Sequence, residues 1–138
     1  MDNSISSSII LEKNELMYLM NYVTSDIQNV NIALLAEYTG ISEPDNRKAI
    51  TGLMQKNIIY FVDNKIVTVK LFDFYIKKMI STENIEIIGD ERKKLVFDNH
   101  GIVFLIKEHN LSENHISIRA FRTKKELLES LTDTEEEQ

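Results

Sequence analysis

Hydrophobic residues recur at helical spacing in the first half of the chain and follow strand-like patterns in the second half. Apolar side chains return every three or four positions in four segments, which we predict as amphipathic helices: 12–23, 32–38, 42–57 and 71–80. Two short apolar runs rich in β-branched residues, 58–62 and 65–69, follow the third helix and predict a hairpin. Three helices and a hairpin are the order of a winged helix-turn-helix.

Capping residues set the expected limits of the third helix. Gly40 supplies a positive φ at the end of the preceding helix. Ser42 is the expected N-cap, because its hydroxyl can accept a hydrogen bond from an N–H of the first turn. Pro44 and Asp45 both suit that turn, since Pro needs no donor there and a carboxylate favours the positive end of the helix dipole.

From about Ile85 the pattern changes to strands. Four segments have strand character: 85–88, 94–98, 102–107 and 115–121. The run 102–107 is nearly all apolar, so we expect a central strand covered on both faces. Along 115–121 the apolar and polar residues alternate, which predicts a half-exposed strand. Thr123 and Glu126 form a capping box that opens a last helix, with Leu127, Leu128 and Leu131 as its buried residues.

The predicted fold class is α+β, with an N-terminal winged-helix-like lobe followed by an antiparallel sheet of three to four strands and a C-terminal helix. The switch from helical period to period two near Ile85 is the basis of that division. Residues 9–11 are consistent with a short strand leading in. The expected organisation is as follows: flexible N-terminus 1–11, winged-helix-like lobe with the following helix 12–82, sheet and terminal helix 83–132, and acidic tail 133–138.

The net charge of −6 is concentrated at the C-terminal end. Six of the 22 acidic residues fall in 126–138, which holds no Lys or Arg, so the remaining 16 balance the 16 basic residues of the rest of the chain. A neutral body lacks the positive field that gives non-specific affinity for nucleic acid. The charge therefore makes nucleic acid an unlikely partner.

Residues that could carry catalysis or hold a metal are scattered. The three histidines, His100, His109 and His115, lie in turns or at a strand start and are not spaced as metal ligands. The four glycines are far apart, so no phosphate-binding loop can be read, and no cysteine is present. We expect no enzyme activity, no cofactor and no metal. With no secretory signal and no apolar run of the ~20 residues that span a bilayer, we expect a cytoplasmic protein without membrane contact.

DNA binding is the first alternative that a winged helix raises. The first turn of the third helix, which faces DNA in such readers, carries Glu43 and Asp45, and these carboxylates would repel phosphates. Arg47, Lys48 and Lys65 are the residues that would contact DNA if the chain were a transcription regulator. Protein contact is the favoured role, and an immunity or structural interaction protein would give the same pattern.

The order of features resembles one half of the EspG family, the cytosolic chaperones of type VII (ESX) secretion. The resemblance covers about residues 12–131 and rests on a shared sequence of segments: a helix with Arg47, Ala49 and Leu53, strand residues Ile58 and Ile59, a turn with Asp63, a helix at 71–80, an extended segment at 83–87, a hairpin from 95–98 to 102–107, a strand at 115–120 and a helix opened by Thr123. Family members contain two such halves, and this chain holds one.

The resemblance implies a non-enzymatic chaperone or targeting adaptor that binds a helical secretion substrate. Family members bind PE–PPE proteins, whereas the Asn-, Lys- and Ile-rich composition is typical of a low-GC Gram-positive bacterium, whose type VII systems export WXG100 and LXG proteins. On the strand 115–120, the outward residues His115, Ser117 and Arg119 are the expected partner contacts, since that strand could form an edge of the sheet.

The resemblance also bears on oligomeric state. A single half would leave open the junction at which two halves form one sheet. An unpaired apolar edge favours association, so we expect a homodimer, or a heterodimer with a sister chain. Val103 and Leu105, on the apolar strand 102–107, are the expected residues of that dimer or sheet-edge contact.

Overall fold

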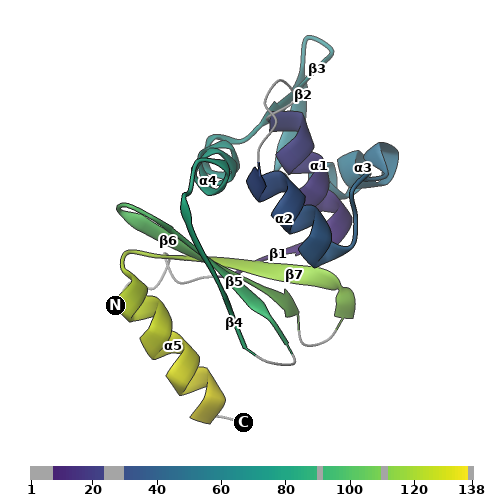
Figure 1. The fold of residues 1–138 in the computed structure, drawn as a ribbon. Helices are drawn as coiled ribbons and strands as arrows, with labels where there is room; N and C mark the ends of the chain where they lie inside the picture. Colours follow the sequence, from purple (N-terminus) through teal and green to yellow (C-terminus); the bar gives the residue numbers. More distant parts are fainter. Residues whose placement is uncertain (1–7, 24–29, 90–91, 110–111, 137–138) are drawn as a thin grey trace. The chain divides into compact units, whose positions relative to one another are not determined.

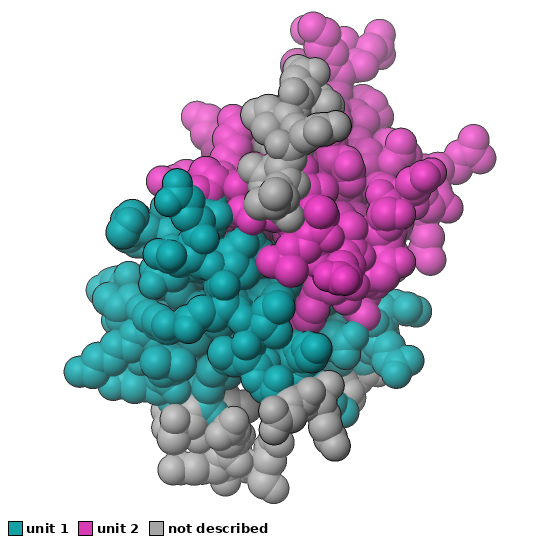
Figure 2. Space-filling model, in the orientation of Figure 1, with its two compact units in different colours: residues 1–10, 82–138 teal, residues 11–81 magenta. Residues whose placement is uncertain are grey.

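The structure is a computed structural model that describes residues 8–23, 30–89, 92–109 and 112–136. Its fold is α+β, as the sequence predicts. The chain divides into two compact units, coloured separately in Figure 2. We call Leu11–Ser81 the winged-helix unit, and Met1–Ile10 with Thr82–Gln138 the sheet unit. The sequence prediction divides the chain after residue 82.

The winged-helix unit contains the predicted helices and hairpin, with slightly different limits (Figure 1). In chain order its elements are α1 (Lys13–Val23), α2 (Val30–Thr39), α3 (Asn46–Gln55), β2 (Ile59–Val62), β3 (Lys65–Thr68) and α4 (Lys70–Ile80). α1 packs against each of the other three helices, and its fully buried Leu16, Leu19 and Met20 contribute to the core. The apolar spacing that predicted α1 therefore marks the face that packs.

The start of α3 corrects the sequence prediction. The N-cap is Asp45 rather than Ser42, and its carboxylate accepts a hydrogen bond from the backbone N–H of Lys48 at 3.2 Å. Asn14 of α1 holds Asp45 from both sides: its Oδ1 accepts from the N–H of Asp45 at 2.7 Å, and its Nδ2 donates to the carbonyl at 3.0 Å. An Asp caps a helix as well as a Ser does, and here a partner from another helix fixes its backbone. Gly40 has the expected positive φ of 80°.

A buried carboxylate joins α1 to α3. Glu15 is almost fully buried, and its two oxygens accept hydrogen bonds from the Glu12 N–H and the Lys56 ammonium, each at 2.9 Å. A Cβ added to Gly52 on α3 would lie 2.0 Å from Oε2 of Glu15, so the carboxylate occupies space that a side chain at 52 would need. The charge is buried with a partner, which is the condition under which interiors tolerate a carboxylate.

The sheet unit is built around a five-stranded sheet in the order β1-β7-β6-β5-β4 (Figure 1). Its elements are β1 (Ile9–Glu12, which crosses the unit boundary), β4 (Asn84–Ile88), β5 (Lys94–Asn99), β6 (Ile102–His109), β7 (Ser112–Phe121) and α5 (Lys124–Glu136). β4 to β7 pair antiparallel in succession. The predicted sheet of three to four strands does not include β1, although the sequence of residues 9–11 is consistent with a strand. The prediction of a flexible N-terminus is wrong for residues 9–11, and residues 1–7 lie outside the described residues.

α5 covers one face of the sheet. Val96, Val103, Leu105 and Phe121 form a buried cluster with Leu127 of α5, and Leu131 packs against its border. Thr123 caps the helix as predicted by accepting from the Glu126 N–H at 3.1 Å, while Glu126 returns a bond to the N–H of Arg122 at 3.4 Å. The helix continues to Glu136, so the predicted acidic tail at 133–138 is helical over 133–136, and 137–138 lie outside the described residues.

Candidate partner-binding surfaces

The β2–β3 hairpin exposes large apolar side chains to solvent. Tyr60, Phe61 and Val62 are 47%, 51% and 46% exposed. Successive residues of a strand point to opposite faces, so Tyr60 and Val62 lie on one face of the hairpin and Phe61 on the other. Both faces of this two-stranded ribbon therefore present apolar surface at Tyr60, Phe61 and Val62, which we call the apolar wing.

The apolar wing is held in a defined conformation. Asp63 and Asn64 close the hairpin with φ values of 51° and 65°, the left-handed pair that a two-residue turn requires and that Asp and Asn tolerate. The hydroxyl of Tyr22 donates a hydrogen bond to the carbonyl of Ile66, which ties α1 to β3. Tyr22 also stacks on Tyr18 with ring centroids 5.7 Å apart. The exposed side chains thus stand on an ordered support.

Two tyrosines of this unit, Tyr18 and Tyr75, have raised pKa values. Burial raises the pKa of Tyr18, and the neighbouring Tyr22 raises it further. Burial likewise raises the pKa of Tyr75 on α4. Each hydroxyl therefore stays protonated at neutral pH and serves as a hydrogen-bonding or packing group. Nothing in these shifts gives either residue the near-neutral pKa that proton transfer needs.

α4 presents a second apolar stripe. Leu71 and Phe74 are exposed and lie three residues apart, which places them on one side of the helix. Charged groups border them: the Lys78 ammonium lies 5.5 Å from the centre of the Phe74 ring, and Lys77 pairs with Asp73 at 2.9 Å. This arrangement of apolar centre and charged border is the composition of a protein-binding surface.

Exposed large apolar residues are concentrated in the winged-helix unit. The described residues of this unit include seven of them: Tyr22, Met54, Tyr60, Phe61, Val62, Leu71 and Phe74. In the described part of the sheet unit such residues are fewer: Ile10, Ile87 and Leu128. Single exposed apolar side chains are ordinary on proteins, whereas three in succession on a hairpin require an explanation.

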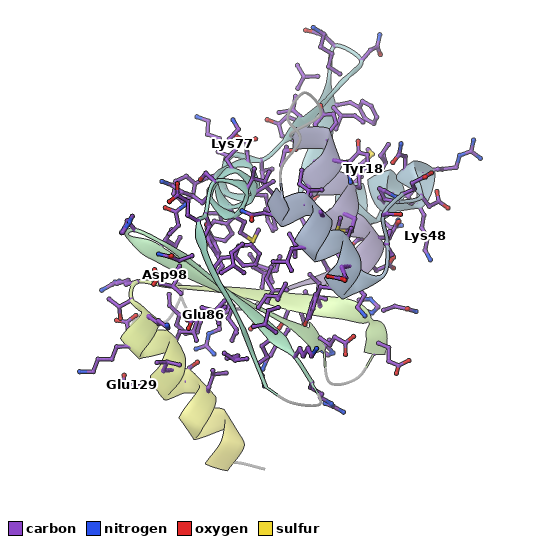
Figure 3. The ribbon with its side chains drawn as sticks, viewed as in Figure 1. Tyr18, Lys48, Lys77, Glu86, Asp98 and Glu129 are labelled. Carbon is purple, nitrogen blue, oxygen red and sulfur yellow. The ribbon has the colours of Figure 1, made fainter. Side chains whose placement is uncertain are left out.

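The residues proposed for DNA contact are exposed. Arg47 and Lys48 lie in the first turn of α3, and Figure 3 shows Lys48 projecting outward from that helix. Lys65 begins β3, directly after the turn, and is also exposed. Asp45 and Glu43 border the same helix start, and the carboxylate of Asp45 is used in the cap. The three cations are exposed, and Lys65 lies on the same hairpin as the apolar wing.

The partner contacts expected on β7 are only partly accessible. β7 lies between β1 and β6, so the expectation that it forms an edge is wrong. Ser117 is only 5% exposed, while His115 and Arg119 are half-buried. Nδ1 of His115 lies 2.9 Å from the hydroxyl of Ser112, and the Arg119 guanidinium stands 4.8 Å from the Phe121 ring centre. The register with β6 places Ser117 and Arg119 on one face, whereas His115 lies next to the register shift at Glu108/His109 and is not part of that regular pairing.

The residues expected at a dimer or sheet-edge contact are in the interior. Val103 and Leu105 belong to β6, which has β5 on one side and β7 on the other, and both pack in the cluster with Leu127. The edge assignment is therefore wrong, although the prediction that 102–107 is a central strand is confirmed. β1 and β4 are the strands at the edges of the described sheet.

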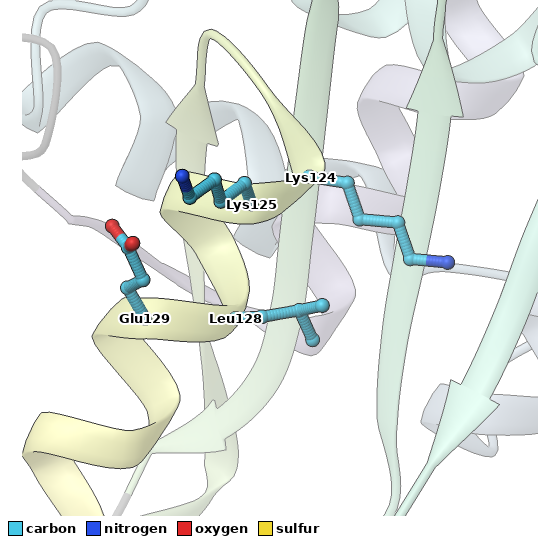
Figure 4. Close-up of a pocket in the computed structure, with 4 residues that line it drawn as sticks. All are labelled: Lys124, Lys125, Leu128 and Glu129. Carbon is cyan, nitrogen blue, oxygen red and sulfur yellow. The ribbon is translucent and has the colours of Figure 1, made fainter.

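Two surface hollows border α5. One is lined by Lys124, Lys125, Leu128 and Glu129, and Figure 4 shows Lys124 and Leu128 projecting to one side of the helix and Lys125 and Glu129 to the other. The second lies between α5 and the β4 edge and is lined by Glu83, Asn84, Ile85, Glu86, Asp98 and Lys124. Lys124 pairs with Glu86 across it. Both are shallow features of a charged surface and contain no catalytic arrangement of side chains.

Within the described residues, no three His, Asp or Glu side chains are grouped closely enough to hold a metal ion. None of the described helices is both long and apolar enough to cross a membrane. Comparison with known proteins found no family model that matches the chain, no similar curated protein and no similar solved structure.

The sequence pattern predicted the hairpin but not the exposure of its apolar side chains. The signal was present, because a two-stranded ribbon cannot bury both of its faces unless something else covers it. The run Ile-Ile-Tyr-Phe-Val at 58–62 places apolar side chains on both faces, and only Ile58 and Ile59 are buried. A surplus of apolar residues on a wing is thus a sign of a binding surface.

Proposed function

We propose that this protein is a non-enzymatic chaperone or targeting adaptor that binds a helical substrate of a type VII (ESX-like) secretion system. The observation that carries the proposal is the apolar wing. A chaperone of this kind must cover apolar surface of its client before export, and it needs preformed apolar side chains within a polar border. Tyr60 and Phe61 are the aromatic anchors that such a surface uses most often.

A helical client fits the apolar wing better than an extended one. An amphipathic helix presents apolar residues at intervals of three and four, and short stretches of two such helices could pack on either side of a ribbon. The side chains at 60 and 62 would contact one helix, and the ring of Phe61 another. Small helical-hairpin proteins, such as the WXG100 and LXG classes, offer this pair of helices. The resemblance in element order to one half of an EspG chaperone supports the same client class.

Self-association is a separate part of the proposal. Because Val103 and Leu105 are covered by α5, the sheet interior no longer argues for a dimer. A homodimer, or a heterodimer with a sister chain, would instead use the apolar wing when no client is present. Light scattering after size exclusion tests this. A monomer of 16.0 kDa at every concentration would contradict it without affecting client binding.

The rival function is DNA binding by a transcription regulator. It is favoured by the exposure of Arg47, Lys48 and Lys65 at the positions that a winged helix turns toward DNA. The apolar wing and the neutral body charge weigh against it, since phosphate contacts supply most of the affinity for DNA. A mobility-shift assay at low salt separates the two, because DNA binding requires salt-sensitive complexes that Arg47→Glu with Lys48→Glu abolishes.

Co-expression with the small helical proteins encoded beside this gene tests the client directly. We expect one of them to purify with the chain in a stoichiometric complex. Phe61→Ser should reduce its recovery at least tenfold, since central aromatic anchors carry about 2 kcal/mol or more of binding energy. Recovery of no partner from any neighbouring gene would contradict the proposal, whatever the result of the DNA assay.

A further inference from the structure

The face of the sheet that carries α5 has an apolar part and a basic part. The apolar part is the cluster of Val96, Val103, Leu105 and Phe121 under Leu127. Side chains two residues apart on a strand share a face, so Lys94 and Lys107 lie on the same face as Val96 and Leu105. Arg119 pairs with Leu105 and Ser117 pairs with Lys107, which places both on that face as well. We call Lys94, Lys107, Ser117 and Arg119 the basic row.

The register brings the charges of the basic row together. Leu95 pairs with Ile106, so one step along the antiparallel ladder sets Lys94 opposite Lys107. Cβ atoms of directly opposed residues are about 4.5–5.5 Å apart, and like charges in that position destabilise a sheet. Arg119 is the diagonal neighbour of Lys107, within reach of a long side chain. Burial lowers the pKa of Lys107, and Lys94 and then Arg119 lower it further.

Described carboxylates do not neutralise the basic row. None of the described Asp or Glu side chains forms an ion pair with Lys94, Lys107 or Arg119. On β4 and β5, the two carboxylates of this face lie in other rows of the ladder: Glu86 pairs with Lys124, and Asp98 stands opposite Val103. Nε of Arg119 is buried and has no hydrogen-bond partner in the described part of the chain. Lys94, Lys107 and the buried Nε of Arg119 thus lie on one face of the sheet, with no ion-pairing partner among the described carboxylates.

We propose that the basic row is a binding site for a tetrahedral oxyanion of the phosphate class. Three cations on one side of a sheet match a dianion, because a phosphate group carries about −1.5 to −2 charges and three acceptor oxygens at neutral pH. A single carboxylate would leave two positive charges uncompensated. Lys94 and Lys107 supply point charges, the buried Nε of Arg119 supplies a directed donor, and the hydroxyl of Ser117 lies opposite Lys107.

The source of the phosphate group is either the free ion or a phosphorylated side chain of a partner. Both present the same oxygens to the basic row, and they differ in what surrounds them. Inorganic phosphate would occupy the row alone. A phosphorylated segment would add contacts along the neighbouring strands and bind more tightly. The test therefore uses inorganic phosphate and O-phosphoserine as separate probes, with acetate as the carboxylate probe.

The experiment is a titration of the ¹⁵N-labelled full chain, followed by NMR at constant ionic strength in a phosphate-free buffer. We expect saturable shifts of the backbone amides of Lys94, Lys107, Ser117 and Arg119 with inorganic phosphate, and weaker, unsaturated shifts with acetate. Tighter binding of O-phosphoserine would identify the side-chain source, and equal binding the free ion. Equal response to acetate and phosphate, or shifts spread over all lysines, would overturn the site.

Lys94→Gln with Lys107→Gln is the variant that tests the residues. It removes a like-charge pair, so the chain should fold without phosphate at least as stably as the wild type. Phosphate affinity should fall at least about tenfold, and the rise in unfolding temperature that phosphate gives the wild type should disappear. The matched control is Lys125→Gln, an exposed lysine on α5. Unchanged affinity in the double variant, or equal loss in the control, would contradict the proposal.

Discussion

Strands β2 and β6 have similar sequences and opposite environments. β2 reads Ile-Tyr-Phe-Val and exposes its last three residues, whereas β6 begins Ile-Val-Phe-Leu-Ile and buries four of these five. β6 has a strand on each side and α5 over one of its faces, while β2 has β3 alone as its sheet partner. An apolar run therefore predicts a strand, but its neighbours in space decide whether its side chains are buried or exposed.

The largest expected difference is in stability. Phe104→Ala on β6 should lower the free energy of unfolding by about 3–5 kcal/mol, because its fully buried ring would leave a cavity. Phe61→Ala on β2 should change it by about 0.5 kcal/mol or less, as exposed positions usually do. Urea denaturation followed by circular dichroism measures both. Equal losses in the two variants would show that the apolar wing is part of the core.

Gly52→Ala tests whether the helices beside the exposed hairpin are themselves tightly packed. Alanine favours a helix by about 1 kcal/mol over glycine, so an open site would be stabilised. Here the new methyl group would meet the Glu15 carboxylate, and we expect a net loss of about 1–3 kcal/mol in unfolding free energy. Gly52→Ala with Glu15→Gln is not a rescue, because the amide fills the same space. A stabilised Gly52→Ala protein would contradict the buried position of Glu15.

Thr123→Ala tests whether the hydroxyl of Thr123 fixes the start of α5, the helix that covers one face of β6. Removing the capping hydroxyl should cost about 1 kcal/mol, since the N–H of Glu126 loses its acceptor. Hydrogen exchange should then speed up in α5. Thr123→Ser, which keeps the hydroxyl, is the matched control and should retain most of the stability. If the Ser and Ala variants lose equal stability, the cap is not what fixes this end of the helix.

The smallest expected effect concerns the basic row and depends on pH. Since the pKa of Lys107 is lower in the folded chain, the unfolded chain binds more protons, and stability gains with rising pH up to the ordinary value of 10.5. The Lys107→Met variant has no ammonium group at this position, so it lacks this pH-dependent contribution to stability. Its advantage over the wild type should be largest at neutral pH and should shrink as the pH approaches 10.5. The raised pKa values of Tyr18 and Tyr75 make stability fall at high pH, but they do so equally in the wild type and in Lys107→Met. A pH-independent difference would contradict the assignment.

Local signals in the sequence predicted most helices and strands. The errors arose where the structure depends on pairing between distant segments. The positive φ of Gly40 and the Thr123 cap follow from short-range chemistry, so the sequence predicts both. The interior position of β7 depends on its pairing with β1, a contact between segments about 100 residues apart in the sequence. Periodicity cannot supply strand order. The dimer edge was misplaced to Val103 and Leu105 for the same reason.

The candidate sites differ in how far the sequence alone could predict them. The exposed apolar wing could have been suspected from 58–62 alone, since the two faces of a ribbon need separate cover. The basic row could not, because Lys94, Lys107 and Arg119 are brought together by the register of three strands. The N-cap error at Ser42 is intermediate, because Asp caps a helix as well as Ser does and the backbone of Asp45 is held by Asn14 of a distant helix.

The most direct measurement of the central claim is co-purification of a helical client with two matched variants. Phe61→Ser changes an apolar side chain that is 51% exposed on the hairpin, and Leu128→Ser changes one that is 46% exposed on α5. If the apolar wing binds the client, the wild type and Leu128→Ser should recover the same stoichiometric complex, and Phe61→Ser should recover about a tenth of it or less. Equal recovery by all three proteins would contradict the account.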